Sequence, residues 1–386
     1  MRIGFFSDTY LPVVHGVTIS METFRNELEK MGHEVYIYTT EIPGYKDSNP
    51  RVFRFKSVRV FKKPELRNAI DFLPVNHSLN DVIDFPLDVI HAHTPFSLGV
   101  LAKFISKKQK IPLIYTHHTH YPEYVKAYLK EAHLLPYLAK VYSRWFCNIS
   151  NVVIAPSLKI KKLLYSYGVK KHIPIHVLPT GIDINKFKPS ARIRSSMRKK
   201  LKISSDKKIL IHVGRIGEEK NVEFVVKAFA EIKKAYDNVL LMMVGDGYFL
   251  GRLKEIVDEL GLKNSVLFTG TVPYEDIVAY YQASDIFVFA SLTDTQGIVI
   301  LEAMGCGLPI VTIKDDAFSD IITDGQEGFM IENQSVKVFA QRVSEILKNK
   351  ELYENFSSLA RKHVVNFSKE RTAEKLEEIY NNLVKI

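Results

Sequence analysis

Apolar and polar residues alternate in blocks along the first half of the chain. Short apolar runs of the kind that form buried strands are followed by stretches whose apolar residues recur at helical spacing. The runs that predict strands cover residues 2–6, 33–39, 52–61, 87–91, 112–116 and 151–155, and helical spacing covers 18–31 and 96–107. Strands that alternate with helices in this way are typical of a parallel, doubly wound sheet.

The second half repeats this alternation after a segment, 178–189, that has turn formers at both ends and no helical period. Strands are predicted at 209–213, 239–244, 266–269, 285–290 and 308–312, with helices at 220–236, 249–260, 274–283, 297–305, 337–349 and 351–384. We therefore predict an α/β protein with two Rossmann-like domains and a cleft between them. The predicted domains are 1–188 and 189–365, and a C-terminal helix, 366–386, is expected to pack back on the first.

The stretch from Ser291 to Pro309 joins a predicted strand to a helix that begins near Gly297. A helix N-terminus that follows a polar turn presents free backbone N–H groups, and these bind anions. Two carboxylates, Asp294 and Glu302, flank the turn. Taken alone, this pattern is equally typical of an ordinary turn with a solvated acid on each side.

Two further strand ends of the second domain carry residues suited to a phosphorylated ligand. Arg215 and Lys220 flank a glycine turn and would bind a diphosphate through charge-assisted hydrogen bonds. Asp246 lies in a Val-Gly-Asp-Gly turn after the next strand. Ligands of doubly wound sheets bind beyond the carboxyl ends of the strands, so three such ends predict one phosphate-binding site.

The first domain offers two candidate loops. The loop after the first strand contains Gly16, and it lacks the glycine fingerprint of dinucleotide binding. His117, His118 and His120 follow another predicted strand, at a spacing that is not that of a His-Glu-x-x-His zinc site. The alternatives are a metal site, one histidine that contacts substrate, or histidines that are merely packed or exposed.

Charge is distributed unevenly along the chain. The formal net charge is +10, and residues 101–200 contain 20 Lys and Arg against 3 Asp and Glu. Such a segment predicts a polyanionic partner, either nucleic acid or an anionic membrane surface, with a solvated lysine-rich surface as the alternative.

Residues 125–146 place apolar side chains, Trp145 among them, on one helical face, and Pro136 should kink or split the helix. An interfacial helix fits this composition, and a core helix whose lysines extend to water fits the same pattern. The basic residues of the segment lie off the apolar face: Lys126, Lys130, Lys140 and Arg144.

The whole-chain composition indicates a soluble globular protein. Mean hydropathy is -0.04, and no apolar run approaches the roughly 18–20 residues that span a bilayer. The chain begins directly with a predicted strand, without a leader-like segment. Two cysteines, Cys147 and Cys306, are too few for a disulfide framework, which favours a reducing cytoplasm.

Over essentially its whole length the chain resembles the retaining glycosyltransferases of family four. This resemblance implies the GT-B fold of two facing Rossmann-like domains. It implies that Arg215 and Lys220 bind the donor diphosphate, that Glu302 binds the ribose, and that Asp294 contacts the sugar hydroxyls. The motifs that carry it are GRIGEEKN (214–221), VGDG (244–247), LPTGID (178–183) and the stretch 291–309. Donor-binding residues implied by the same resemblance are Gly16, Asp246, Gly297, Ile298 and Val299.

Two stretches of the first domain are similar to the bacterial 1,2-diacylglycerol 3-alpha-glycosyltransferases: FSDTYLPVVHGVTIS and IYTHHTHYPEY. This similarity places the family's acceptor-side histidine at His118. It also implies membrane or acceptor contact through the basic, amphipathic segment, namely Lys126, Lys130, Lys140, Arg144 and Trp145. Asp294 is one methylene shorter than the family's usual glutamate, so both glucose and galactose stay open as the transferred sugar.

Our hypothesis is a hexosyltransferase that moves glucose or galactose from a UDP-sugar to diacylglycerol with retention, with His118, Asp294, Arg215 and Lys220 as the catalytic residues. The expected partners are a UDP-hexose, diacylglycerol and an anionic lipid surface, without nucleic acid and without a required metal or cofactor. The expected location is the inner face of the cell membrane, peripherally bound from the cytoplasm. The alternatives are a family-four transferase with another acceptor, phosphatidylinositol or a lipopolysaccharide sugar, and an epimerase of UDP-N-acetylglucosamine.

Overall fold

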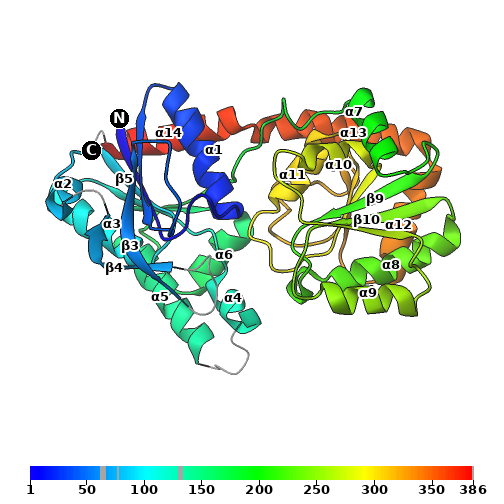
Figure 1. The fold of residues 1–386 in the computed structure, drawn as a ribbon, viewed down its shortest axis with the longest axis horizontal. Coiled ribbons are helices and arrows are strands. Elements are labelled where there is room, and N and C mark those ends of the chain that lie inside the picture. Colours follow the sequence, from blue (N-terminus) through cyan, green and yellow to red (C-terminus); the bar gives the residue numbers. More distant parts are fainter. Residues whose placement is uncertain (61–66, 76–77, 129–133, 385–386) are drawn as a thin grey trace. The chain divides into compact units, whose positions relative to one another are not determined.

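The structure, a computed structural model, describes residues 1–60, 67–75, 78–128 and 134–384. The chain divides into two compact units (Figure 1). Unit 1 comprises Met1–Gly181 and Lys369–Ile386, and unit 2 comprises Ile182–Ser368. The first boundary lies a few residues before the predicted one, because Ile182 and Phe187 are buried in the core of unit 2.

Unit 1 is built on a sheet with the strand order β4-β3-β2-β1-β5-β6-β7-β8. Neighbouring strands are parallel except for the β3–β4 pair, which is antiparallel. Buried apolar runs form the central strands, as expected for a sheet that is covered on both faces. The strands are β1 (Arg2–Ser7), β2 (Glu34–Thr40), β3 (Val52–Arg59), β4 (Arg67–Pro74), β5 (Val89–Ala92), β6 (Leu113–Thr116), β7 (Val152–Ala155) and β8 (Ile175–Val177).

Helices cover both faces of this sheet. On one face, Met21 and Leu28 of α1 pack with Leu376 and Tyr380 of α14, and Figure 1 shows the two helices side by side. The other face is covered by α3, α5 and α6. Pro136 lies in the first turn of α5, so the predicted 125–146 helix is split into α4 and α5. The helices are α1 (Gly16–Lys30), α2 (Leu79–Ile83), α3 (Ser97–Gln109), α4 (Tyr121–Tyr128), α5 (Leu135–Ile149), α6 (Leu158–Ser166) and α14 (Lys369–Val384).

Unit 2 contains a parallel sheet with the strand order β11-β10-β9-β12-β13-β14. Its strands are β9 (Lys208–Val213), β10 (Val239–Val244), β11 (Val266–Gly270), β12 (Ile286–Phe289), β13 (Ile310–Ile313) and β14 (Gly328–Ile331). Its helices are α7 (Ala191–Lys200), η1 (Glu218–Lys220), α8 (Val222–Ala235), α9 (Leu250–Glu259), α10 (Ile277–Ala283), α11 (Ile298–Gly305), α12 (Val336–Lys348), α13 (Lys350–Val364) and η2 (Val365–Phe367).

The predicted fold class, two doubly wound α/β sheets, is confirmed. The stretch predicted to be helical at 351–384 is divided into α13, η2 and α14. The break lies where Ser368 makes a bridge to Ile182, at the end of unit 2. The pattern also missed short or amphipathic elements at the edges of the sheets, namely β4, β8, β14, α2, α6 and α7.

Candidate functional site

Each sheet has one point from which the chain winds outward in both directions. In unit 1 this switch point lies between β1 and β5, and in unit 2 it lies between β9 and β12. Loops that leave adjacent strands at such a point diverge and expose the strand ends to ligands. The predicted site residues of unit 2 follow β9, β10 and β12, and those of unit 1 follow β1 and β6.

Two glycine turns of unit 2 touch each other beyond the ends of β9 and β10. A Cβ added at Gly245 would lie 2.0 Å from the Gly214 carbonyl oxygen, and one added at Gly247 would lie 2.3 Å from the Ile216 carbonyl oxygen. The Ile216 N–H donates to the Asp246 carbonyl at 2.9 Å. The Asp246 carboxylate accepts from the N–H of Gly247, within its own turn. The glycines therefore fix the position of the loop that carries Arg215 and Lys220.

Lys220 and Asp294 meet at the switch point of unit 2. The Lys220 ammonium lies 3.0 Å from both carboxylate oxygens of Asp294, although the two residues are far apart in sequence. Both side chains are about four-fifths buried, with 18% and 19% exposed. Arg215 is more exposed and pairs with Glu219 at 2.8 Å. The site thus holds two cations at the β9 turn, one of them oriented by an acid from the β12 turn.

The N-terminus of α11 completes this part of unit 2. Gly297 has a φ of 75°, which favours glycine, and an added Cβ would lie 2.7 Å from the Phe318 ring. Ile298 and Val299 follow in the first turn of the helix, where backbone N–H groups have no acceptor within the helix. This geometry is of the kind that binds anions, and anion binding here stays a prediction.

Glu302 lies deeper than the other predicted residues, with 2% of its surface exposed. The Tyr281 hydroxyl donates to its Oε2 at 2.8 Å, and Tyr274 is a second hydrogen-bond donor. Burial raises the pKa of Glu302 to about 7, while both tyrosines and the charge of Lys186 oppose this shift. A carboxylate can accept more than two hydrogen bonds, so Glu302 can also accept from ribose hydroxyls while it is bonded to both tyrosines. Its ribose role stays a prediction.

Asp8 organises the corresponding switch point of unit 1. Its carboxylate accepts from the Thr94 hydroxyl at 2.6 Å, the Leu98 N–H at 3.0 Å and the Ser97 hydroxyl. These donors lie between β5 and the start of α3, so Asp8 joins the end of β1 to the loop after β5. Burial raises the pKa of Asp8, and the hydrogen bonds from Ser97, Thr94 and Leu98 oppose this shift.

Replacing Asp8 by alanine should destabilise the protein by about 2–4 kcal/mol, because three buried donors would lose their acceptor. The expected fall in melting temperature is about 5–10 °C. A matched control is Asp84→Ala, which removes only an exposed pair with Lys108 and should cost less than about 1 kcal/mol. Equal melting temperatures for Asp8→Ala and Asp84→Ala would contradict the structural role of Asp8.

The three neighbouring histidines separate in the structure. His117 is buried against the Tyr115 hydroxyl, His120 stacks on Tyr167, and His118 lies 3.0 Å from His93. They therefore do not converge on one point. Among the described residues, no group of three His, Cys, Asp or Glu side chains is arranged to hold a metal ion.

Gly16 and His15 lie near His118. His15 bonds the Thr9 hydroxyl at 2.7 Å, and its charge lowers the pKa of His118 as the second cause after burial. Gly16 begins α1, and a Cβ added there would meet nothing within 4 Å. Packing in unit 1 therefore does not require glycine at this position. The space beside Gly16 is open to a ligand.

The predicted membrane residues that the structure describes lie on α4 and α5. Trp145 is 44% exposed, Lys140 lies 5.5 Å from the centre of the Tyr167 ring, and Lys126 pairs with Glu123. The aliphatic part of Arg144 packs near Gly168. Lys130 lies outside the described residues. No helix in the described ranges is both long enough and apolar enough to cross a bilayer.

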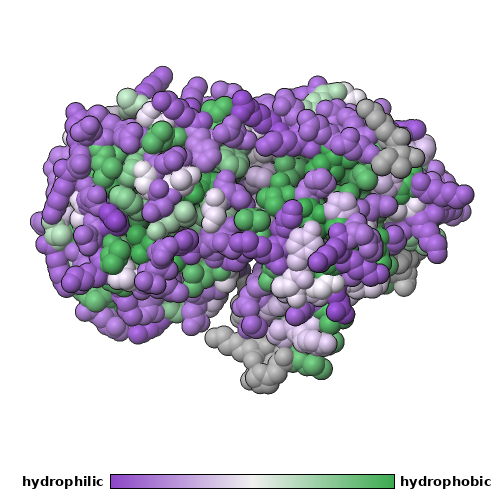
Figure 2. Space-filling model, turned by 180° about the vertical axis from the view of Figure 1, so that it is seen from behind, coloured by the Kyte–Doolittle hydropathy of each residue, from purple (hydrophilic) through white to green (hydrophobic). Residues whose placement is uncertain are grey.

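The sequence pattern missed an exposed apolar stripe on α3, formed by Phe96, Val100 and Phe104. The stripe continues onto α5, because Phe96 stacks on Tyr142 and Tyr142 contacts Trp145. Figure 2 shows hydrophobic surface of unit 1 interspersed with hydrophilic surface.

The sequence analysis also missed two histidines. His93 would have been found by a search of the residues that follow predicted strands. His212 is buried below the Gly214 turn, and burial lowers its pKa to about 4.

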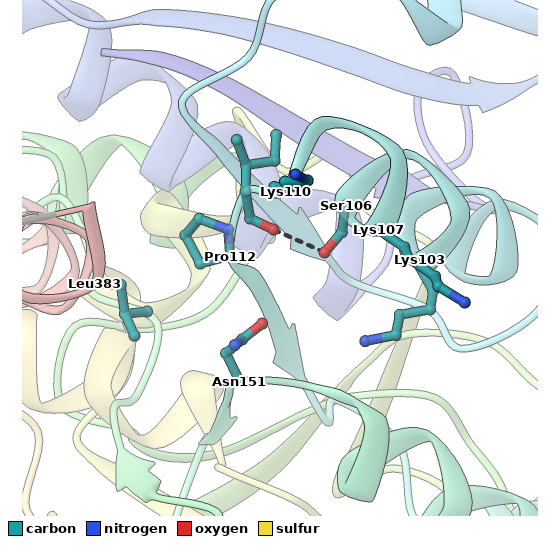
Figure 3. Close-up of a pocket in the computed structure, with 8 residues that line it drawn as sticks. Lys103, Ser106, Lys107, Lys110, Pro112, Asn151 and Leu383 are labelled. Atoms are coloured by element: carbon teal, nitrogen blue, oxygen red, sulfur yellow. Dashed lines mark hydrogen bonds between the residues drawn. The ribbon is translucent and has the colours of Figure 1, made fainter. Parts of the chain in front are cut away.

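A cavity of about 740 Å³ lies elsewhere, beside the amino ends of β6 and β7 (Figure 3). Three of its polar side chains already have partners: Ser106 donates to the Ile111 carbonyl, Asn151 accepts from the Leu113 N–H, and Lys103 donates to the Ile149 carbonyl. Lysines near the end of α3 are also expected from the helix dipole. We assign no ligand to this cavity.

Two family models each match one part of the chain. The model described as Glycosyltransferase Family 4 matches residues 14–186, and the model described as Glycosyl transferases group 1 matches residues 193–363. The two matches fall largely on unit 1 and unit 2, respectively.

The chain is 37% identical to the alpha-monoglucosyldiacylglycerol synthase of Streptococcus pneumoniae over 334 residues, which cover 85% of this chain and 74% of that protein. It is 30% identical over 394 residues to the Acholeplasma laidlawii protein of the same name, covering 100% of this chain and 98% of that protein. The solved structure of Anabaena Alr3699/HepE with UDP and glucose is similar, with a TM-score of 0.78 and 20% identity, and 99% and 100% of the two chains are covered. This structural likeness shows the fold and confirms the predicted GT-B class.

Proposed function

Because the chain belongs to glycosyltransferase family 4, we propose that it transfers glucose from UDP-glucose to 1,2-diacylglycerol with retention, giving an alpha-glucosyl lipid. That the chain is a hexosyltransferase follows from the family. Glucose and diacylglycerol are supported by the names of the two relatives with 37% and 30% identity.

The Lys220–Asp294 pair carries the donor half of the proposal. Phosphate oxygens of the donor would bind Lys220, Arg215 and the N–H groups at the start of α11. These groups are preorganised, since the glycine turns fix their loop and Asp294 orients the ammonium. Fixed positive groups of this kind stabilise the charge that develops on a leaving diphosphate, which is commonly the largest contribution to catalysis.

The proposed reaction exchanges one bond at the anomeric carbon for another. The bond from that carbon to the diphosphate oxygen breaks, and a bond to the 3-hydroxyl oxygen of diacylglycerol forms on the same face of the sugar. The hydroxyl proton passes to the departing phosphate, so the products are UDP and the glucosyl lipid. Asp294 would hold sugar hydroxyls and His118 the acceptor hydroxyl.

The second half of the proposal concerns the acceptor, diacylglycerol, which we place at unit 1. The exposed stripe on α3 and α5 supplies an apolar surface, and the same two helices carry the positive charges of Lys107, Lys140 and Arg144. Apolar and basic side chains together are typical of surfaces that bind anionic bilayers. We therefore include an anionic lipid surface among the partners, with the enzyme bound peripherally at the inner face of the membrane.

Product analysis tests the function directly. The purified protein is incubated with vesicles that contain 1,2-diacylglycerol and with UDP-glucose or UDP-galactose, and the lipid product is identified by mass and anomeric configuration. We expect an alpha-glucosyl product. A galactosyl product would change the donor, product only with phosphatidylinositol or a lipopolysaccharide sugar would change the acceptor, and conversion of the UDP-sugar alone would indicate an epimerase.

Donor affinity should depend on the ionisation of Glu302. If its carboxylate accepts from the ribose hydroxyls, protonation below pH 7 removes that acceptor, so UDP-glucose should bind up to about tenfold more weakly at pH 6 than at pH 8. Burial raises the pKa of each neighbouring titratable group, Tyr274, Tyr281 and Cys306, away from this range. Calorimetry without acceptor measures the affinity.

The control for this pH dependence is Glu302→Gln, which cannot ionise. Its UDP-glucose affinity should be nearly the same at pH 6 and pH 8. UDP-glucose is used because its diphosphate has no group that titrates in this interval. A wild-type affinity that is independent of pH would remove Glu302 from the ribose site.

A further inference from the structure

His93 and His118 form a hydrogen-bonded pair at the ligand-binding edge of unit 1. His93 Nδ1 lies 3.0 Å from His118 Nε2, and the two rings are nearly parallel, 5.3 Å apart. His93 follows β5 and is fully buried, whereas His118 follows β6 and is partly exposed. One proton lies between the two nitrogens, and which ring carries it decides what His118 offers to a substrate.

Both rings are neutral at ordinary pH. Burial lowers the pKa of His93 well below its usual value, and the neighbouring His91 and His118 act in the same direction. Burial also lowers the pKa of His118 to about 3. A neutral imidazole has one N–H donor and one bare nitrogen acceptor, so the pair has only two arrangements.

The surroundings of His93 choose between these arrangements. Its other nitrogen, Nε2, is buried and has no hydrogen-bond partner in the part of the chain that the structure describes. A proton there would create a buried N–H without an acceptor, which is rarer in proteins than a bare acceptor and leaves a donor desolvated without compensation. His93 therefore carries its proton on Nδ1 and donates it to His118 Nε2.

This assignment fixes the tautomer of His118. Since Nε2 accepts, the single proton of the His118 ring lies on Nδ1. That nitrogen makes no hydrogen bond with the described residues, and the side chain is partly exposed. His118 thus presents a donor, not a bare nitrogen, to a ligand at this edge.

We propose that His93 is a positioning residue that holds His118 in its Nδ1–H tautomer, so that His118 donates a hydrogen bond to the acceptor hydroxyl oxygen and does not remove its proton. This inference rests on the proposed function for the identity of the acceptor. The donated bond occupies one lone pair of the hydroxyl oxygen and orients the other toward the anomeric carbon. The hydroxyl proton then remains free to pass to the leaving phosphate.

The tautomer is measured first, in the free enzyme. Long-range proton–nitrogen correlation spectra of histidine-labelled protein distinguish Nδ1–H from Nε2–H rings, and His118 and His93 variants assign the signals. We expect an Nδ1–H ring for His118 in the wild type and a loss of this preference in His93→Phe. An Nε2–H ring for His118 in the wild type would overturn the proposal, whatever activity the enzyme has.

Matched amide variants then test the catalytic consequence. The amide N–H of asparagine can replace a donor at Nδ1, and that of glutamine can replace one at Nε2. For His118 we expect glutamine to lower kcat about 100-fold and asparagine to retain more of it, since misplaced substrate contacts cost about this factor. Equal or higher activity of His118→Gln would overturn the donor role.

Matched variants of His93 test its positioning role. His93→Asn keeps a donor toward His118 and should retain most activity, whereas His93→Phe should lower kcat about tenfold, the worth of one hydrogen bond, with the KM for UDP-glucose unchanged. His176→Asn, at an exposed position of β8, is the control. If both His93 variants melt like the wild type and have equal kcat, His93 does not position His118.

Absence of glucosyl transfer in the wild type would refute the proposed function, whereas the tautomer measurement in the free enzyme would still stand.

Discussion

Replacement of Lys220 by alanine should lower kcat for glucosyl transfer by about 10²–10³-fold, the usual effect of losing one preorganised group that stabilises transition-state charge. The ammonium of Lys220 is held 3.0 Å from both oxygens of Asp294, at the switch point of unit 2. Its place in η1 contributes little to the core, but its loss leaves the largely buried carboxylate of Asp294 without this partner, so the stability cost should be about 1–3 kcal/mol. Steady-state kinetics and thermal melting measure the two effects.

The matched control is Lys227→Ala, on the next helix. Lys227 is 52% exposed and, among the described residues, pairs with Glu223 one turn away, so its loss should leave kcat unchanged. Lys220→Arg keeps the charge and should recover part of the activity, limited by the different shape of the guanidinium. Near-normal turnover of Lys220→Ala would remove the diphosphate role from this residue and, with it, the donor half of the proposal.

Vesicle binding should weaken by about 100-fold when Phe104 and Trp145 are both replaced by serine, because each removes part of a contribution of about 1.5–3 kcal/mol for a buried apolar side chain. The two residues lie on α3 and α5 and are 55% and 44% exposed in the free protein. Cosedimentation with vesicles of phosphatidylglycerol measures the affinity. The wild type should also bind more weakly at high salt, since Lys107, Lys140 and Arg144 contribute by charge.

Surface apolar residues of unit 2 provide the control for this experiment. Leu260 and Val338 are exposed to a similar extent, and their replacement by serine should leave vesicle binding unchanged. The Phe104 and Trp145 variant should keep its UDP-glucose affinity, because neither residue lies in unit 2. Unchanged vesicle binding of this variant would place the membrane contact elsewhere or remove it from the proposal.

The short side chain of Asp294 acquires a physical context from the structure. At this length the carboxylate forms a two-oxygen contact with Lys220. Asp294 is therefore both a candidate for the sugar hydroxyls and the partner that orients the diphosphate cation. The sequence comparison with the family's usual glutamate addresses only the first role.

The periodicity of the chain by itself determined the alternation of strands and helices, the two doubly wound sheets and the location of glycine turns, because these depend on local spacing and on turn chemistry. The positions of Arg215, Lys220, Gly297 and Asp294 after β9 and β12 were predicted for the same reason. The edge strands β4 and β14 were missed. β14 has only four residues and little periodicity of its own, and β4 is defined by its antiparallel pairing with β3, which local pattern does not show.

Only the tertiary structure decided which side chains meet. Asp8 reaches Ser97, Tyr281 reaches Glu302, and His93 reaches His118, in each case across a large distance in sequence. The Asp8 and His93 contacts form because parallel strands that are adjacent in the sheet bring their carboxyl ends to one edge. The Tyr281 contact forms between the helices α10 and α11. The order of strands in the sheet is set by packing and crossover connections, not by local pattern. Packing also decided which side of α3 remains uncovered. The spacing of Phe96, Val100 and Phe104 alone indicates an apolar stripe, and only the structure shows that this stripe is exposed.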